Sequence, residues 1–198
     1  MLRFDSMANA AKKKATYEEL VALPGNMVGE IIRGVLHANP RPAKPHAAAA
    51  AALGEELGPP FKRGRGGPGG WIILDEPELH LDEDVLVPDL AGWRRERMPT
   101  LDQGAFFTMA PDWVCEVLSA RTAKTDRAEK LPIFAAHGVG HAWLVDPRLR
   151  TLEVLRRDGA HWVIVGTHHD DARVRAEPFE AIELELGILW ADVVLEEK

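Results

Sequence analysis

The segment from Trp113 to Leu118 is apolar at every position except Glu116. A short, continuous apolar run predicts a strand that is buried on both faces, as at the centre of a sheet covered by helices. The following stretch, residues 122–137, is predicted to hold a helix that Gly138 ends. A buried strand followed directly by a helix predicts a domain of the α/β class.

Pro132 restricts where the regular part of that helix can begin. A proline is tolerated in the first turn of a helix, but in the interior it removes a hydrogen bond and clashes with the preceding turn. We therefore expect the regular helix to start near Glu129, which leaves Pro132 in its first turn.

Capping residues and alternating patterns predict most of the remaining elements. Thr16 and Glu19 form a capping-box pattern that starts a short helix. Residues 28–38 are expected to form a hairpin that turns near 33–34. Further strands are predicted at 71–74, 85–87 and 142–145, and a second hairpin at 151–155 and 162–165.

An alanine-rich stretch, His46 to Leu57, predicts a second long helix, which Gly58-Pro59-Pro60 is expected to stop. The polar stretch 94–103 is expected to be a loop. Together these elements predict an α/β fold in which a mixed central β-sheet is flanked by α-helices. Residues 1–15 are predicted to be a disordered lead-in, and residues 16–198 a single domain.

Composition narrows the function classes. The net charge of −7 argues against binding nucleic acid through the whole surface, although it leaves room for a local basic groove. The chain has one cysteine, Cys115, so no internal disulfide can form and a cytoplasmic location is expected. No apolar run reaches the roughly 18 residues of a membrane-spanning helix, so no membrane contact is expected.

Asp89 and Glu116 are carboxylates in or beside apolar runs, which makes them candidates for an active site. Burying two acids close together costs free energy unless a cation or hydrogen bonds offset the charge. A divalent metal with a nearby lysine, such as Lys130, would offset it and would also suit phosphodiester cleavage. The alternative is that both acids are structural, and that Lys130 forms only a surface ion pair with Asp126 four residues earlier.

The residues resemble the Uma2 family of restriction-endonuclease-like proteins, within the PD-(D/E)XK nuclease fold group. The resemblance extends from about Thr16 to Trp190. The segments that carry it, in chain order, are Thr16 to Leu20, Glu30 to Gly34, His46, Pro88-Asp89, Glu116 to Ser119, Thr122, Asp126, Lys130-Leu131, Gly138-Val139 and Trp143 to Pro147.

The resemblance implies a metal-dependent nuclease with a restriction-endonuclease-like core. It implies that Asp89, Glu116 and the Val117 backbone carbonyl hold Mg²⁺ or Mn²⁺. The lysine of the fold group's motif falls at Leu118 here, so the resemblance implies that Lys130, on the helix, takes its role. It implies a further catalytic acid in Glu30.

His46 and Asp126 are expected to support this site. The implied reaction is hydrolysis of phosphodiester bonds in DNA, and the implied assembly is a homodimer. The alternative function is a catalytically inactive module that keeps the nuclease fold to bind DNA or a protein partner, since Leu118 replaces the usual lysine.

A glycine-rich loop gives a weaker signal for nucleic-acid contact. Gly64 to Gly69 formally matches a dinucleotide-binding pattern, but it precedes a strand instead of linking a strand to a helix. The loop is therefore expected to be flexible. Its basic residues Lys62, Arg63 and Arg65 are predicted to touch a phosphate backbone.

Overall fold

The structure, a computed structural model, describes residues 13–194. Of the predicted lead-in, residues 1–12 lie outside the described residues. Ala15 lies within them, and its backbone N–H donates to the Gly34 carbonyl at 2.8 Å. Ala15, the last residue of the predicted lead-in, is therefore already bonded to the β1–β2 turn. No helix in the described part of the chain is both long enough and apolar enough to span a membrane.

The helices and strands follow one another in a mixed order. They are α1 (Tyr17–Val21), β1 (Met27–Ile32), β2 (Val35–Pro40), α2 (Lys44–Leu57), η1 (Gly58–Lys62), β3 (Trp71–Asp75), β4 (Leu79–Leu81), β5 (Asp84–Leu86), β6 (Leu90–Arg94), β7 (Trp113–Val117), α3 (Ala123–Thr125), η2 (Asp126–Lys130), α4 (Leu131–Ala136), β8 (His141–Asp146), β9 (Thr151–Asp158), β10 (His161–His169), β11 (Arg173–Val174), β12 (Leu184–Glu185) and η3 (Leu186–Trp190).

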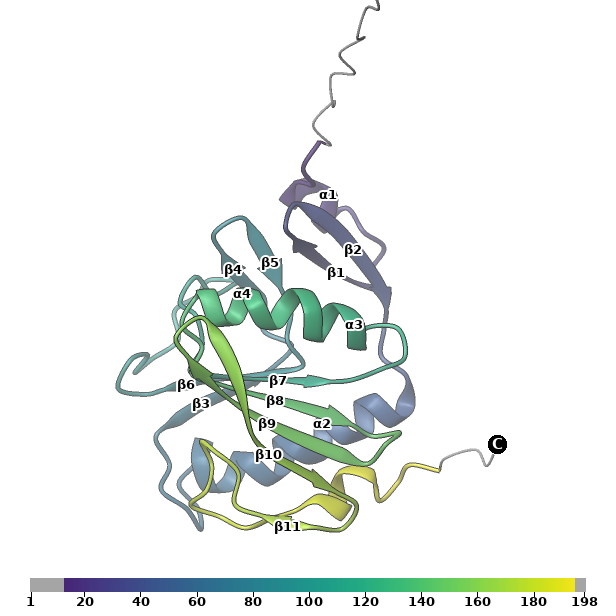
Figure 1. The fold of residues 1–198 in the computed structure, drawn as a ribbon. Helices are drawn as coiled ribbons and strands as arrows, with labels where there is room; N and C mark the ends of the chain where they lie inside the picture. The colour runs from purple at the N-terminus through teal and green to yellow at the C-terminus, as the bar shows by residue number, and fades with distance from the viewer. Residues whose placement is uncertain (1–12, 195–198) are drawn as a thin grey trace, which may run out of the picture.

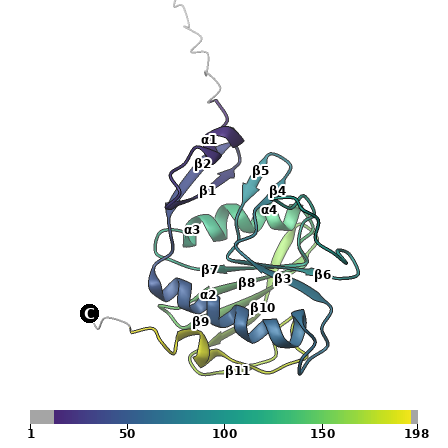
Figure 2. The same ribbon diagram turned by 180° about the vertical axis from the view of Figure 1, so that it is seen from behind.

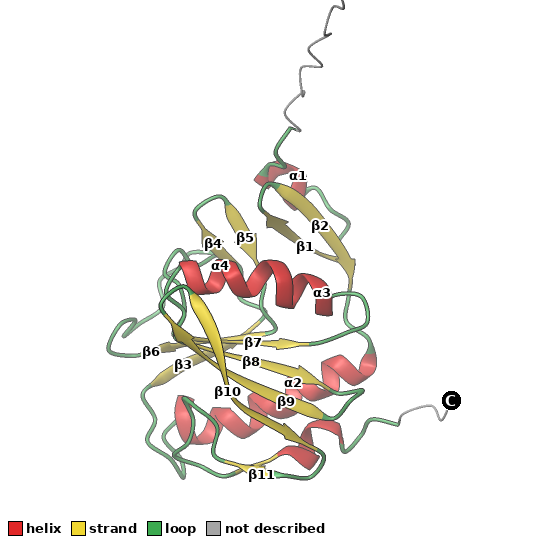
Figure 3. Cartoon of the chain, in the orientation of Figure 1, coloured by secondary structure: helices red, strands yellow, loops and turns green. Residues whose placement is uncertain are grey.

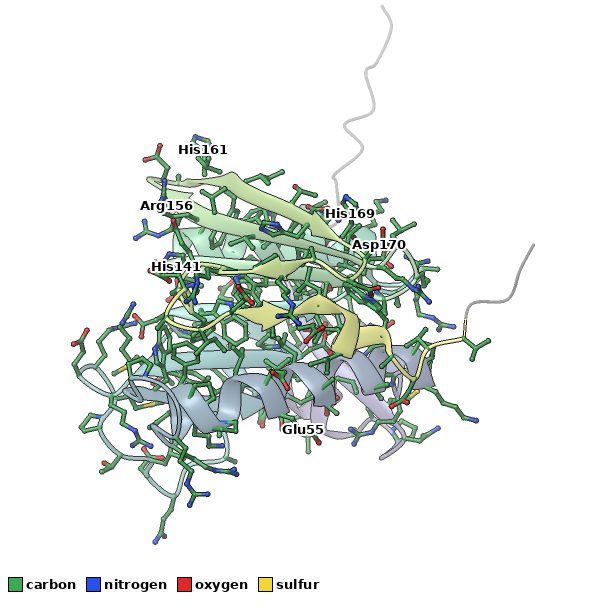
Figure 4. The ribbon with its side chains drawn as sticks, turned by 90° about the horizontal axis from the view of Figure 1, so that it is seen from below. Glu55, His141, Arg156, His161, His169 and Asp170 are labelled. Carbon is green, nitrogen blue, oxygen red and sulfur yellow. The ribbon has the colours of Figure 1, made fainter. Side chains whose placement is uncertain are left out.

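The main sheet has six strands in the order β10-β9-β8-β7-β6-β3. Only β7 and β8 run parallel, and the other neighbours are antiparallel, so the predicted mixed sheet is confirmed. Helices α3 and α4 lie over one face of this sheet and α2 lies under the other (Figure 1 and Figure 3). A view from below shows the C-terminal segment beside α2, with Glu55 pointing away from the sheet and His141 near Arg156 at one edge (Figure 4).

Strand β7 is buried at all five positions, as predicted for a central strand. Its side chains alternate between the two faces of the sheet. Trp113, Cys115 and Val117 pack in the cluster that includes α2. Val114 packs in the opposite cluster with residues of α4. Glu116 therefore faces the side of the sheet that the α3–η2–α4 helix covers.

A second, smaller sheet stands apart from the main one, in the order β2-β1-β5-β4 (Figure 2). The predicted hairpin is confirmed as the β1–β2 pair, in which Ile32 lies opposite Val35 across a turn at Arg33 and Gly34. Both turn residues have positive φ, 51° and 77°, which suits this tight connection.

Strand β6 was not predicted, and it changes the place of Asp89. In the sequence, Asp89 comes two residues after the strand predicted at 85–87. In the structure β5 ends at Leu86 in the small sheet and β6 begins at Leu90 in the main sheet. Asp89 thus lies on the connection that joins the two sheets. Glycine at position 92 hid the strand. An added Cβ there would lie 3.2 Å from the Trp71 and Trp113 rings, so the two rings would have to shift to admit a side chain.

Of the two proline-containing helical segments, one differs from the prediction and the other agrees with it. Gly58-Pro59-Pro60 does not stop α2 but continues it through one wide π-helical turn, η1. The helix predicted within residues 122–137 begins at Ala123 and passes through another π-turn, η2, and its regular part, α4, starts at Leu131, close to the predicted start near Glu129. Pro132 lies in the first turn of α4 as expected. Pro59 and Pro60 lie inside the π-turn η1, whereas Pro132 directly follows the π-turn η2. In both places the wider turn gives the proline ring more room from the carbonyl one turn earlier.

The capping box at Thr16 is confirmed, and it gives a small testable effect. The Thr16 hydroxyl accepts from the Glu19 N–H at 3.3 Å, and the Glu19 carboxylate accepts from the Thr16 N–H at 3.0 Å. Thr16→Ala is expected to lower the free energy of unfolding by about 1 kcal/mol. Thr16→Ser retains the hydroxyl and should stay close to the wild type in urea denaturation. Equal losses in both variants would contradict the capping role.

Candidate active site

A pocket of about 430 Å³ opens where β7 and β8 end beneath the small sheet. Its floor and lower walls are formed by the residues that the sequence singled out. These are Glu30 from β1, His46 from α2, Asp89 between the sheets, Glu116 from β7, and Asp126 and Lys130 from η2. The structure therefore brings together six side chains from five separate segments of the chain.

Lys130 lies at the centre of the acidic side chains and is almost fully buried. Its Nζ is 2.8 Å from Glu116 Oε1 and 2.9 Å from Glu30 Oε1. Asp126 Oδ1 lies farther away, at 3.8 Å, so the sequence-neighbour pair is the weakest of the three contacts. Lys130 also donates to the Val87 carbonyl at 3.4 Å. The interpretation of Lys130 as part of a surface ion pair is therefore wrong, because it is buried against three carboxylates.

The local folding of β7 and η2 explains why Glu116 and Lys130 meet. Alternation along β7 points Glu116 toward the covering helix. On that helix, Lys130 is the last residue of the π-turn η2, directly before the apolar face of α4. Leu118, at the fold group's lysine position, is instead buried in the apolar cluster with α4. The ammonium group thus reaches Glu116 from the helix and not from the strand.

Asp89 is held from two sides. Its Oδ2 accepts a hydrogen bond from the Val117 N–H at 2.7 Å, which places the Val117 peptide beside this carboxylate. Its Oδ1 is 3.2 Å from His46 Nε2. On the other wall, Glu30 Oε1 accepts from the Val87 N–H at 2.8 Å. These contacts fix the orientation of both carboxylates without using an external ligand.

The electrostatics of the pocket are dominated by excess negative charge. Burial raises the pKa of Glu116 well above its usual range, Lys130 lowers it, and Asp126, Asp89 and Glu30 raise it further. Burial also raises the pKa of Asp126 to about 6, against the opposing effect of Lys130. Burial alone would lower the pKa of Lys130, but the surrounding carboxylates outweigh it and raise that pKa, so the lysine stays protonated.

The side chain of His46 responds to the same charges. Burial alone would lower the pKa of His46. The hydrogen bond and charge of Asp89, together with the charges of Asp126 and Glu76, outweigh burial and raise it above the ordinary value. The imidazole therefore adds some positive charge beside Asp89, although its Nδ1 is buried without a hydrogen-bond partner.

The residues fit a hard divalent cation that takes only part of its ligands from protein. Glu116 Oε1 is buried, and Lys130 Nζ lies 2.8 Å from it, so this oxygen already faces a positive charge in the pocket. Within residues 13–194 no group of three or more His, Cys, Asp or Glu side chains is arranged as a complete metal site. Mg²⁺ commonly binds through one or two carboxylates and completes its shell with water and substrate phosphates. Asp89 and Glu116 could supply such a pair.

The basic residues that were predicted to touch a phosphate backbone do not line the active-site pocket. Lys62, Arg63 and Arg65 follow the C-terminal end of α2, whereas His46 is near its beginning, and none of the three lines the active-site pocket. The arginines that do line it, Arg41, Arg121 and Arg148, were not singled out from the sequence. Arg148 could have been found from the sequence, because it closely follows β8, the parallel neighbour of the strand that carries Glu116.

Comparisons with known proteins agree with this geometry. The sequence matches the model of the Uma2 family, described as "Putative restriction endonuclease", over residues 16–188. Among solved structures, the fold matches the crystal structure of "a putative nuclease belonging to DUF820" from Anabaena variabilis, with a TM-score of 0.69 and 24% sequence identity. The match covers 88% of this chain and 96% of that one. At this identity the likeness establishes a shared fold. No curated protein matches the sequence.

Proposed function

Because the chain belongs to the Uma2 family, we propose that it is a Mg²⁺- or Mn²⁺-dependent endonuclease that hydrolyses phosphodiester bonds in DNA. The observation that carries the proposal is the position of Lys130, whose Nζ is 2.8 Å from Glu116 in a pocket that also contains Asp89. Two carboxylates that could hold a metal ion and a lysine that could stabilise charge on a phosphate suit metal-dependent phosphodiester cleavage.

Asp89 and Glu116 are the residues that would hold the metal, with the Val117 carbonyl as a third oxygen ligand. When bound, a divalent ion supplies Lewis acidity and makes water a better nucleophile at neutral pH. The Val117 N–H and His46 keep the Asp89 carboxylate in place for this purpose. Such supporting contacts set ligand orientation and commonly affect metal affinity.

Lys130 would act on the reacting phosphate, and Glu30 would hold Lys130 in position. Lys130 remains protonated and places a positive charge at the pocket floor, where it would stabilise the charge that develops on phosphate oxygens. Glu30 is bound to both the Val87 N–H and Lys130, so it fixes the position of the ammonium group. Burial of these groups strengthens each interaction, because the local dielectric constant is lower than in water.

The second candidate is an inactive nuclease-fold module that binds DNA or a protein. One observation favours it: Lys130 already offsets part of the charge of Glu116 and Glu30 without any metal. The two candidates differ in one respect that can be measured directly. Only the nuclease should need a divalent cation for its activity and gain stability from it.

We therefore predict that the purified protein cuts plasmid DNA with Mg²⁺ or Mn²⁺ and not with EDTA. In parallel, a metal that binds only the folded state should raise the free energy of unfolding by about 2.7 kcal/mol at a hundredfold excess over its dissociation constant. Melting curves with and without metal measure this. No cutting of any tested DNA together with an unchanged melting temperature would favour the inactive module.

A homodimer would allow both strands of a duplex to be cut, and we include it in the proposal. Sedimentation of the purified chain with and without a DNA duplex tests the assembly. A monomer in both conditions would contradict the proposed homodimer, but it would not affect the assignment of the active site.

A further inference from the structure

Arginines surround the mouth of the pocket, in contrast to its acidic floor. Glu30, Glu116, Asp126 and Lys130 at the floor are buried, whereas Arg41, Arg121 and Arg148 at the rim are exposed. A rim of this kind attracts anions even though the chain as a whole carries a net charge of −7. The three arginines differ in how firmly the structure holds them.

Arg148 is the one whose guanidinium is fixed by a buried partner. Asp146, the last residue of β8, is almost fully buried. Its Oδ1 accepts from Arg148 Nε at 3.3 Å and its Oδ2 accepts from Arg148 Nη2 at 3.0 Å. The same carboxylate accepts the backbone N–H groups of Arg148 and Leu149 at 2.9 and 3.1 Å. These four donors hold both the turn and the side chain.

The guanidinium nevertheless remains open toward the pocket. The Arg148 side chain is 44% exposed and lines the cavity, and its Nη1 makes no hydrogen bond to residues 13–194. By contrast, Arg41 pairs with the exposed Glu76 at 3.2 Å, and Arg121 has no ion pair within the same residues. A planar, permanently charged group that is oriented in advance is well suited to bind a phosphate.

The strand topology explains why this arginine lies beside the acidic floor. Strands β7 and β8 are parallel, and Glu116 is opposite Leu144 in their register. Their C-terminal ends therefore reach the same edge of the sheet. The chain leaves β8 at Asp146 and passes through Pro147 and Arg148 along the pocket wall. A phosphate bound by Arg148 would lie beside the pocket floor and not in it.

From this geometry we propose that Arg148, positioned by Asp146, forms a binding site for a backbone phosphate of the nucleic acid adjacent to the phosphate that is cut. The inference rests on the proposed function for its nucleic-acid ligand. It assigns Arg148 to binding and Asp146 to positioning, and it gives neither of them a role in the chemical step.

Binding measured without cleavage tests this assignment. The Asp89→Asn chain, in EDTA, is titrated into a fluorescent DNA duplex at several salt concentrations. Adding Arg148→Gln is expected to weaken binding about tenfold and to lower the slope of log K against log salt by about one, since one phosphate contact is lost. Arg148→Lys keeps the charge without the planar fork, so it should retain most of the slope but not the full affinity.

Arg97→Gln is the matched control. Arg97 pairs with Asp112 at 2.7 Å and has a side chain 43% exposed, close to the 44% of Arg148. Asp112 precedes β7, so this pair lies at the opposite end of the strand from the pocket. Arg97→Gln should leave both the affinity and the salt slope unchanged. An equal effect of Arg97→Gln and Arg148→Gln would overturn the local site.

Asp146→Asn tests whether Asp146 positions Arg148 or only supports the fold. On its own it should weaken DNA binding, but added to Arg148→Gln it should weaken binding no further, because it acts through that arginine. A purely structural role would give the same loss in both backgrounds and would overturn the positioning assignment. An unchanged affinity and slope in Arg148→Gln would overturn the phosphate site.

The source of the phosphate and the proposed function can be tested separately. Inorganic phosphate is titrated against the same variants by thermal denaturation. Stabilisation by phosphate that depends on Arg148, without any DNA binding, would overturn the nucleic-acid ligand. Cleavage is scored separately on the chain with Asp89 intact. If the wild type cleaves DNA but Arg148→Gln leaves DNA binding unchanged, this inference alone fails. If the wild type binds DNA through Arg148 but does not cleave it, the nuclease proposal alone fails.

Discussion

Asp89→Asn is expected to lower DNA cleavage at least about a thousandfold, since a metal's Lewis acidity contributes several kcal/mol and about 1.4 kcal/mol corresponds to a factor of ten. The substitution removes the charge that would attract the cation but keeps the shape of the side chain. The amide oxygen of the introduced asparagine can still accept from the Val117 N–H, which the Asp89 carboxylate now binds at 2.7 Å. We therefore expect the folded structure to persist, and initial cleavage rates in Mg²⁺ measure the loss.

The control for this substitution is another aspartate beside a histidine. Asp170 Oδ2 lies 2.9 Å from His169 Nδ1, in the turn after β10, and both side chains are exposed outside the pocket (Figure 4). Asp170→Asn should cut DNA as the wild type does. The metal-dependent gain in melting temperature should also vanish in Asp89→Asn and persist in Asp170→Asn. Wild-type cleavage by Asp89→Asn would remove Asp89 from the active site.

Lys130→Met is expected to lower the free energy of unfolding by about 3–5 kcal/mol in the absence of metal. The methionine roughly preserves the volume of the side chain, so the loss measures charge more than packing. Without the ammonium group, Glu116 and Glu30 lose ion pairs of 2.8 and 2.9 Å and remain buried. Urea denaturation in EDTA measures the change.

Lowering the pH should reduce the loss of stability in Lys130→Met. Asp126 already has its pKa raised to about 6 in the folded state, and removing Lys130 removes a group that lowers it. An acid whose pKa is higher in the folded than in the unfolded state binds protons on folding, so stability falls as the pH rises through that pKa. The difference between Lys130→Met and the wild type should therefore be larger near about pH 8 than near about pH 5.

Glu116→Gln is the matched variant for the same cluster. It removes one of several buried carboxylates and leaves Lys130 paired with Glu30 at 2.9 Å. We expect it to change stability by no more than about 1 kcal/mol, and to restore part of the loss when combined with Lys130→Met. Such a rescue also keeps the test informative if Lys130→Met alone fails to fold. A fully stable Lys130→Met chain would contradict the role of the lysine in balancing the charge.

Local structure could be predicted from the sequence to a useful degree. The capping box at Thr16, the β1–β2 hairpin, α2 and the buried strand β7 were all predicted close to their observed limits. Strand β6 was missed because Gly92 interrupts its pattern, and that glycine packs closely against two tryptophan rings from other strands. The π-turns were missed because prolines usually stop a helix, whereas here a wider turn accommodates them.

The chemical identity of the candidate site was also present in the sequence, but its geometry was not. The residue types at Asp89, Glu116 and Lys130, together with the order of the motifs, were enough to recognise the family. Nothing local showed that Lys130 would be closer to Glu116 than to Asp126, which is four residues away on its own helix. The rim arginines were not singled out because their relevance depends on which strand ends share an edge.

The sequence by itself thus determined most of the secondary structure, the burial of β7 on both faces and the set of reactive side chains, since these depend on hydrogen bonds and periodicities within a few residues. Only the tertiary structure decided that Glu30 shares Lys130 with Glu116, that Asp89 lies between two sheets, and that Asp146 holds Arg148 at the pocket rim. These distances arise when apolar faces from distant parts of the chain pack together, and that packing positions polar groups that have no contact along the chain.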